Sequence, residues 1–269
     1  MIIREKDFFK EYIGVWDEGA EKDAPFITLG IEVLLKDYYG DLLDAPPPFP
    51  MKEGEFILDL GCGWGRVLKP VMDRKGIGVG LDISGKMLSL SRDHLKKNGH
   101  IPRLTRGDGT RLPFREDSFD RVYSLLVLQH LSKENGREVM QEISRVLKEG
   151  GTAHVRVPGR FAPENLLFSF LQFISIHVFR YRDPIRMRFY RPGEIRRMCR
   201  GIFSNVEITA HEFRPPWNFH TKWTWHYILV PRFLHRPLRK ISDRLENLAN
   251  RHLGFLKPFG VVLMIHARK

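Results

Sequence analysis

The chain has 269 residues, of which 42% are hydrophobic and 28% charged, and its formal net charge is +12. This composition excludes a collagen-like or disordered protein, and the length allows one large domain. Residues 1–150 carry 23 Lys and Arg against 25 Asp and Glu, whereas residues 151–269 carry 21 against 7. The basic excess in the second half predicts either an anionic partner, such as RNA or a lipid surface, or a basic surface that serves solubility.

The first 50 residues are expected to form a helical cap and a connector. Apolar residues near helical spacing predict helices within residues 4–43, where Tyr12 and Trp16 either cover the binding site or pack in the core. The run APPPFP (45–50) cannot continue a helix and predicts an extended connector. Charged residues occupy the place where a signal peptide needs an apolar segment, so we expect a cytoplasmic protein.

Strands and helices alternate from residue 53 to residue 158. Strands are expected at 56–60, 77–81, 101–108, 118–128 and 152–158, and helices at 65–74, 84–99 and 133–151. This alternation predicts a parallel sheet with helices on both faces. In such a sheet ligands bind at the carboxyl ends of the strands.

The alternation ends after residue 159. We expect a very apolar helix at 161–182, a short helix at 191–203, and two further strands at 205–210 and 260–269. Its apolar run, LLFSFLQFISIHVF (166–179), is too short to span a bilayer, and the helix either packs as a buried lid or offers an apolar face to a hydrophobic acceptor or a membrane. Residues 211–257 are aromatic and basic. Their tryptophans can either stack on a nucleic-acid base or pack in the core.

The cysteines and histidines predict no metal centre. Cys62 and Cys199 form neither a disulfide framework nor a zinc motif, and no histidine stands at metal-ligand spacing. Nothing near Cys62 in the sequence lowers the pKa of its thiol, so a reactive thiol is not expected.

The stretch LDLGCGWGRVL (58–68) places a glycine-rich turn after the first strand. It is not a P-loop, because Gly65 is followed by Arg66 and Val67 where a P-loop needs Lys and Ser or Thr. It is not a dinucleotide fingerprint either, because the third glycine comes one residue too early. Asp59 lies within the strand and Asp82 ends the next one, where a carboxylate suits the ribose diol of NAD or of S-adenosylmethionine alike.

The residue at the end of the third strand distinguishes between these ligands. Asp108 stands at its carboxyl end, where a carboxylate can accept a hydrogen bond from an adenine amino group. Asp59, Asp82 and Asp108 therefore surround one nucleoside and leave no cationic residue for a pyrophosphate. This pattern predicts a single adenosine that carries a sulfonium, as in S-adenosylmethionine.

Five segments in this order resemble the class I S-adenosylmethionine-dependent methyltransferases, within the broad small-molecule and ubiquinone-biosynthesis-like group. They are LDLGCGWG (58–65), LDIS (81–84), GDGTRLPFREDSFD (107–120), LLVLQHL (125–131) and EISRVLKEGGTAHVRVP (142–158). The resemblance covers roughly residues 53–160. It implies an α/β fold of Rossmann-like type, in which helices sandwich a seven-stranded, mostly parallel sheet. The last strand is antiparallel in this family, and we place it at 260–269.

The resemblance also implies the cofactor contacts. Asp59, Gly61, Cys62 and Gly63 would approach the methionine portion, and Asp82 would bind the ribose hydroxyls. Ile83, Met87, Asp108, Gly109 and Thr110 would surround the adenine, and Leu125 or its neighbour would line the pocket after the fourth strand. Gly109 stands where many relatives have alanine. His130 is either a general base or a residue that positions its loop, and we favour the second role because relatives with very different acceptors carry a histidine there.

One methyltransferase domain is expected over 1–269. Its expected parts are a cap and connector (1–50), a cofactor-binding core (53–158), acceptor-side lids or insertions (159–200 and 211–257) and final strands (201–210 and 260–269). The reaction expected is in-line methyl transfer to a small or amphipathic acceptor resembling a lipid, quinone or metabolite. Peripheral membrane contact is a further expectation, and the oligomeric state is not predicted.

Two other functions compete with that interpretation. A tRNA or rRNA methyltransferase would use the basic second half, although the chain has no recognisable RNA-binding module or (N/D)PPY motif. The other is a non-catalytic scaffold that binds S-adenosylmethionine. The complete set of cofactor acids in this chain argues against it.

Overall fold

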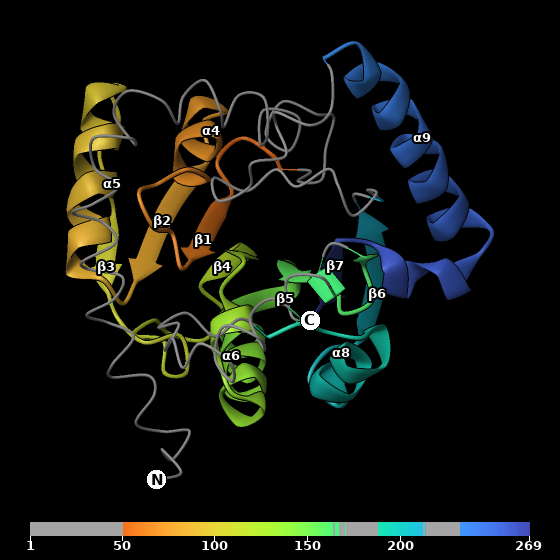
Figure 1. The fold of residues 1–269 in the computed structure, drawn as a ribbon. Coiled ribbons are helices and arrows are strands. Elements are labelled where there is room, and N and C mark those ends of the chain that lie inside the picture. The colour runs from red at the N-terminus through yellow and green to blue at the C-terminus, as the bar shows by residue number, and fades with distance from the viewer. Residues whose placement is uncertain (1–50, 164, 167–169, 171–187, 212, 214–231) are drawn as a thin grey trace, which may run out of the picture.

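The computed structural model describes residues 51–163, 165–166, 170, 188–211, 213 and 232–269. Seven strands form one sheet, and helices flank it (Figure 1). The strands are β1 (Phe56–Leu60), β2 (Ile77–Asp82), β3 (Leu104–Arg106), β4 (Phe119–Leu125), β5 (Leu147–Pro158), β6 (Asn205–His211) and β7 (Val262–Arg268). The helices are α4 (Leu68–Asp73), α5 (Gly85–Lys97), η1 (Leu128–His130), α6 (Lys133–Val146), α8 (Pro192–Cys199), α9 (Arg232–Arg251) and η3 (Gly254–Phe259).

The strand order is β3-β2-β1-β4-β5-β7-β6. The strands β1 to β5 pair in parallel, and β7 runs antiparallel to both β5 and β6. The predicted fold class, including the antiparallel last strand, is confirmed. The order reverses between β1 and β4, and a doubly wound sheet binds its ligand at the carboxyl ends of the strands at that point.

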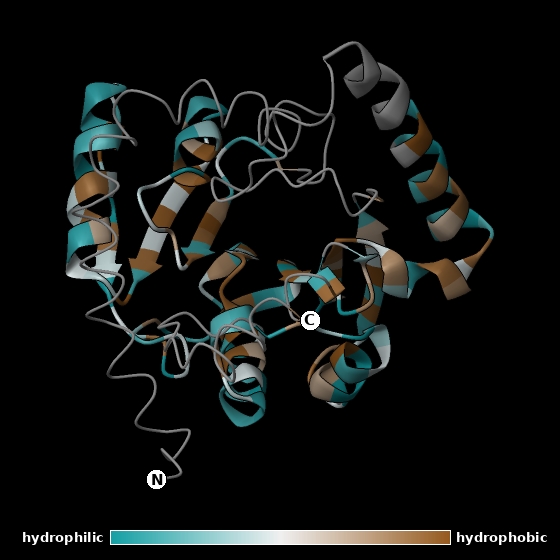
Figure 2. Cartoon of the chain, viewed as in Figure 1, coloured by the Kyte–Doolittle hydropathy of each residue, from teal (hydrophilic) through white to brown (hydrophobic). Residues whose placement is uncertain are grey.

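Helices cover both faces of the sheet because successive strand residues point to opposite sides. On one face Ile57 packs with Val71 of α4, and on the other Leu58 packs in the cluster that contains Ile143 of α6. Figure 1 shows α4 and α5 on one side of the sheet and α6 and α8 on the other. The buried strands are brown in Figure 2, as expected for a parallel sheet enclosed by helices.

Several expected boundaries were wrong. The helix expected from residue 65 begins at Leu68, because Gly65 has a φ of 88° and cannot start a right-handed helix. The helix expected over 133–151 ends at Val146, and β5 begins at Leu147 with an irregular register against β4. The strand expected over 101–108 is paired only from Leu104 to Arg106.

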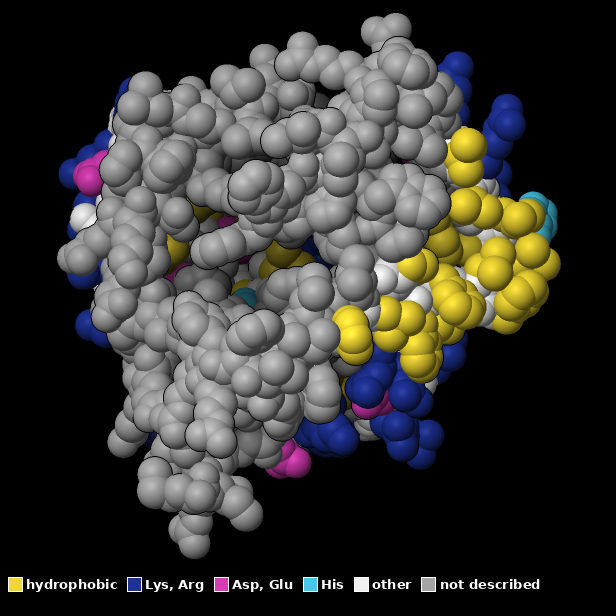
Figure 3. Space-filling model, in the orientation of Figure 1, with side chains coloured by type: hydrophobic (Ala, Val, Ile, Leu, Met, Phe, Trp, Pro, Cys, Tyr) yellow, Lys and Arg dark blue, Asp and Glu magenta, His cyan; other side chains and the backbone are white. Residues whose placement is uncertain are grey.

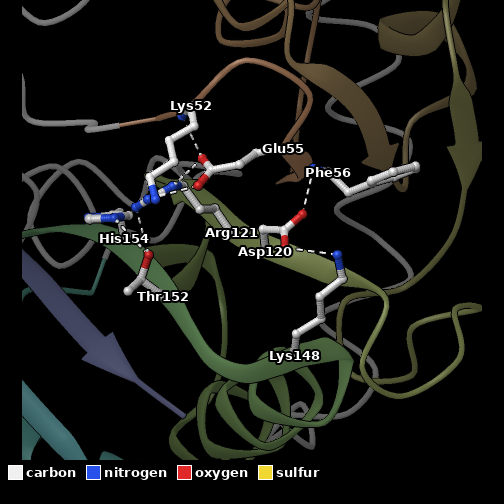
Figure 4. Close-up of polar contacts among 8 residues, drawn as sticks. All are labelled: Lys52, Glu55, Phe56, Asp120, Arg121, Lys148, Thr152 and His154. Atoms are coloured by element: carbon white, nitrogen blue, oxygen red, sulfur yellow. Dashed lines mark hydrogen bonds and ion pairs between the residues drawn. The ribbon is translucent and has the colours of Figure 1, made fainter.

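The amino ends of β1, β4 and β5 are joined by ion pairs (Figure 4). Arg121 Nε donates to Glu55 Oε2 at 2.7 Å, and Arg121 Nη1 donates to Thr152 Oγ1 at 3.0 Å. Lys148 pairs with Asp120 at 2.8 Å. These contacts hold the register of the three strands at their amino ends.

His154 of β5 continues this polar row toward β7. Its Nδ1 lies 2.9 Å from Nδ1 of His266, and the side chain is buried. Burial, together with His266 and Arg121, lowers the pKa of His154 to about 3. The imidazole is therefore neutral at physiological pH and acts as a hydrogen-bonding group.

Several expected features lie outside the described residues. They are the cap over 1–50 with Tyr12 and Trp16, most of the apolar helix at 161–182, and the tryptophans of 214–231. Among the described helices none is sufficiently long and apolar to cross a membrane. The part of the chain that the structure describes holds no cluster of His, Cys, Asp and Glu suited to a metal ion.

Candidate functional site

Asp59 lies near the carboxyl end of β1 and is buried. Its Oδ2 has no hydrogen-bond partner among the described residues. Burial, opposed by the nearby Arg66 and reinforced by Asp82, raises the pKa of this carboxyl to about 7. A buried, unsatisfied carboxylate next to a second acid is costly unless a cation binds there. Asp59 is therefore suited to bind a positive charge in addition to that of Arg66.

The glycine turn uses its own backbone N–H groups internally. The amides of Gly61 and Cys62 both donate to the carbonyl of Leu81, at 2.7 and 3.0 Å. The amide of Gly63 donates to Asp82 Oδ2 at 2.8 Å, and that of Gly65 to the carbonyl of Cys62. A phosphate-binding turn must aim such amides at its ligand. This turn instead presents acids, which excludes a pyrophosphate at this position and favours a cationic ligand.

Gly61 is required by packing across the switch point. Its φ is 73°, and a Cβ there would lie 2.2 Å from Cγ2 of Val127, in the segment after β4. Sequence reasoning placed Leu125 or its neighbour in this pocket wall. Leu125 packs against a core cluster with Ile57 and Tyr123, whereas Val127 lies against the glycine turn. Val127 was missed because its role depends on a contact between residues 66 positions apart in the chain.

Asp82 joins the turn to the second and third strands. Its Oδ1 accepts from the amide of Ser84 at 2.9 Å, and its backbone carbonyl accepts from the amide of Gly107. Asp108 Oδ1 accepts from the amide of Thr110 at 2.9 Å. The structure thus brings the carboxyl ends of β1, β2 and β3 together as predicted, with both acids half-buried at that edge.

The residues expected beside an adenine lie around the start of α5. Ser84 caps this helix by accepting from the amide of Met87 at 3.1 Å. Ile83 and Met87 are both half-buried, so each keeps apolar surface available to a flat ring. A Cβ on Gly109 would contact Leu60 at 3.3 Å, so this loop packs directly on the sheet.

Cys62 and His130 contribute little reactivity. Burial, with the acids Asp59 and Asp82, raises the pKa of the Cys62 thiol well above its usual value. Burial lowers the pKa of His130 to about 4. His130 Nε2 lies 3.1 Å from Nε2 of Gln129 in η1. An imidazole of this basicity is a weak proton acceptor at neutral pH, which favours the positioning role.

Glu142 and Arg145 of α6 hold the loop that follows Asp108. Glu142 Oε2 accepts from the amide of Leu112 at 2.7 Å. Arg145 donates to the carbonyls of Leu112 and Phe114, at 3.0 and 2.9 Å, and also pairs with Glu142. Both segments are among the five motifs named from the sequence, but their contact with each other was not predicted. Their contact spans about thirty residues, and neither segment signals it locally.

These contacts form an acidic edge at the carboxyl ends of β1, β2 and β3 that favours a cationic ligand. Known proteins agree with this. Residues 58–155 match the methyltransferase domain family. The demethylmenaquinone methyltransferase of Tropheryma whipplei is 37% identical over 99 residues, which are 36% of this chain and 39% of that protein. The tRNA (carboxymethyluridine(34)-5-O)-methyltransferase of Arabidopsis thaliana is 33% identical over 108 residues, or 40% of this chain and 25% of that protein.

The methyltransferase solved in complex with the Trm112 methyltransferase activator of Haloferax volcanii has a similar fold. It aligns over 94% of this chain and 95% of its own, with a TM-score of 0.59 and 24% identity. Fold and matched segment together define the class of this domain, a Rossmann-like methyltransferase domain. Residues 58–155 are a domain of the class I S-adenosylmethionine-dependent type, whose cofactor is S-adenosylmethionine. The chain spans well under half the length of the two curated relatives named above.

Proposed function

We propose that this protein transfers a methyl group from S-adenosylmethionine to a small or amphipathic acceptor. The observation that carries the proposal is Asp59, a buried carboxylate whose Oδ2 has no hydrogen-bond partner among the described residues, beside a turn that offers acids in place of amides. The α-ammonium of S-adenosylmethionine supplies the missing cation at Asp59. The family resemblance assigns the ribose hydroxyls to Asp82 and the adenine amino group to Asp108.

The chain's own residues contribute to transfer mainly by positioning. When bound, the cofactor supplies a methyl group that its sulfonium already activates. Val127 packs on Gly61 and forms an apolar wall beside the turn, which limits the access of water to this side of the site. Tyr190 Oη donates to the carbonyl of Leu128 at 2.7 Å, and so fixes η1 and His130 after β4. In-line transfer needs this alignment more than it needs a base.

Two lines of support favour an apolar acceptor. The T. whipplei relative acts on demethylmenaquinone by its name, and the described wall after β4 is apolar at Val127. RNA is the second candidate acceptor, because the second half of the chain is strongly basic and the A. thaliana relative is a tRNA methyltransferase. We further propose that the protein acts in the cytoplasm.

Calorimetry with S-adenosylmethionine tests the cofactor site. Asp59, with a pKa of about 7, is largely protonated at pH 6, and binding of an ammonium there expels that proton. Titrations in two buffers of different ionisation enthalpy should show more proton release at pH 6 than at pH 8. Asp59→Asn should abolish the release and weaken binding at least about tenfold. Proton release that is unchanged in Asp59→Asn would assign the cation to another group.

A labelling experiment separates the acceptors. The protein is incubated with methyl-labelled S-adenosylmethionine and separate lipid, RNA and small-molecule fractions of a cell extract, and Asp82→Ala serves as the negative control. Label in the lipid or small-molecule fraction supports the proposal. Label in RNA alone supports the second candidate, together with a band shift of bulk tRNA that weakens as salt rises.

A further inference from the structure

The side of the molecule formed by α9 and η3 is unusually apolar. Five large side chains there are exposed: Ile241 by 53%, Leu245 by 38%, Leu248 by 39%, Phe255 by 69% and Phe259 by 48%. We call these five residues the α9–η3 surface. Figure 3 shows a continuous hydrophobic area on this side, bordered by Lys and Arg. An apolar area of this kind on a soluble protein marks an interaction surface.

The orientation of α9 explains why these residues face outward. Glu246 and Asn250 lie on the opposite side of the helix and bind β6. Glu246 Oε1 lies 2.7 Å from Nδ1 of His211, and Asn250 exchanges two hydrogen bonds with the backbone of Ala210, at 2.8 and 2.7 Å. The helix therefore turns Glu246, Asn250 and the small, buried Ala249 toward the sheet, and its large apolar side chains away from it. This reverses the usual arrangement of a surface helix.

Helical periodicity joins the apolar residues into one stripe. Ile241, Leu245 and Leu248 stand four and three positions apart, so they lie one above the other on the same side of α9. Figure 2 shows brown residues recurring along this helix between teal ones. Phe255 and Phe259 of η3 extend the stripe past the end of α9. The ring of Phe259 lies 6.5 Å from that of Phe161, so the apolar area continues toward β5.

Cations border this stripe. Lys240, Arg244 and Arg251 are exposed on α9, each next to the stripe around the helix. At the other end the guanidinium of Arg191 lies 4.7 Å from the centre of the Phe161 ring. Apolar and aromatic side chains flanked by Lys and Arg are the composition of helices that lie in a membrane interface.

We propose that the α9–η3 surface docks on an anionic lipid bilayer. The apolar stripe would enter the boundary between headgroups and acyl chains, and the flanking cations would contact lipid phosphates. A second copy of this chain fits less well, because pairing these surfaces would bring the same cations together. This inference is independent of the proposed methyl transfer, since none of its residues belongs to the cofactor site.

Sedimentation with lipid vesicles tests the proposal on the full chain. We expect binding to vesicles of phosphatidylcholine with about 30% phosphatidylglycerol, and at least about tenfold weaker binding to pure phosphatidylcholine. High salt should weaken the binding, because it screens the cations on the surface. Failure to bind the anionic vesicles, or equal binding to both kinds, would overturn the proposal.

Variants assign the binding to this surface. Leu248→Ser with Phe255→Ser should lower vesicle binding at least about tenfold, and Arg244→Gln with Arg251→Gln should lower it selectively at low salt. Ile101→Ser is the matched control, since Ile101 is 75% exposed just before β3, at the opposite edge of the sheet from β6. It should leave binding unchanged. Circular dichroism and calorimetry with S-adenosylmethionine establish that each variant is folded.

Two further outcomes contradict the proposal. Vesicle binding that survives in the Leu248→Ser, Phe255→Ser variant would place the contact elsewhere. A dimer in analytical ultracentrifugation that the same variant dissociates, without vesicle binding by the parent chain, would identify a second copy as the occupant. Neither outcome changes the proton release expected at Asp59, so failure here is distinguishable from failure of the proposed function.

Discussion

Replacing Asp59 with asparagine should stabilise the unliganded protein. Asparagine keeps the shape of the side chain and removes the charge that is buried near the carboxyl end of β1. The pKa of Asp59 is raised from 3.8 to about 7 in the folded protein, mainly by burial. The folded state therefore holds this proton more tightly than the unfolded state does. The contribution of Asp59 to stability falls as pH rises from about 4 to about 7, and is constant above that range.

The difference of about three pKa units sets the magnitude. At pH 8 the ionised carboxyl costs the folded state about 4 kcal/mol, and at pH 5 about 2 kcal/mol. Asp59→Asn removes this cost, so its advantage over the parent protein should grow by about 2 kcal/mol between pH 5 and pH 8. A stability gain accompanied by loss of cofactor affinity is typical of a residue kept for function.

Urea unfolding of both unliganded proteins at pH 5, 6.5 and 8 measures this difference. Comparing the two proteins at each pH cancels the titration of all other groups. Asp93→Asn, which removes an exposed carboxylate of α5, is the matched control and should show no such trend. A difference between Asp59→Asn and the parent that does not vary with pH would refute the reasoning.

Three further predictions concern the packing and protonation of the core. Gly61→Ala should cost about 3 kcal/mol in urea unfolding, because its Cβ meets Val127 at positive φ, and adding Val127→Ala should restore part of that loss. Arg145→Met frees the loop carbonyls that Arg145 binds. It should clearly weaken S-adenosylmethionine binding in calorimetry and lower the melting temperature only slightly. The pKa values of His154 and His130 are lowered to about 3 and about 4, so each histidine is protonated at a lower pH in the folded state than in the unfolded state. Stability should therefore fall as pH drops below about 6.5, by about 2 kcal/mol per histidine at pH 5, and His154→Asn should reduce the slope.

The cofactor side of the domain was largely predictable because its signals are local. The glycines of 61–65 and the acids Asp59 and Asp82 lie within a few residues of strand ends that hydrophobic patterns identify. Parallel strands then bring those ends to one edge of the sheet. The predicted neighbourhood of Asp59, Gly63 and Asp82 accordingly agrees with the observed contacts.

The helix α9 was not predicted. Residues 211–257 were expected to be an aromatic and basic acceptor-side lid or insertion, with no helix assigned, although Arg232–Arg251 forms a continuous helix. Its apolar stripe resembles the core-facing side of an ordinary surface helix. Only the contacts of Glu246 and Asn250 with β6 show that the stripe faces away from the sheet.

By itself the sequence determined the class of fold, the kind of cofactor and the acids at three strand ends, because each depends on short local patterns that recur in a recognisable order along the chain. The tertiary structure decided which groups complete the site and which surface faces outward. Val127 meets Gly61 across the switch point, and Arg145 holds a loop about thirty residues away. The unsatisfied oxygen of Asp59 is a property of its surroundings, since burial and hydrogen bonding depend on residues that the chain brings together only on folding.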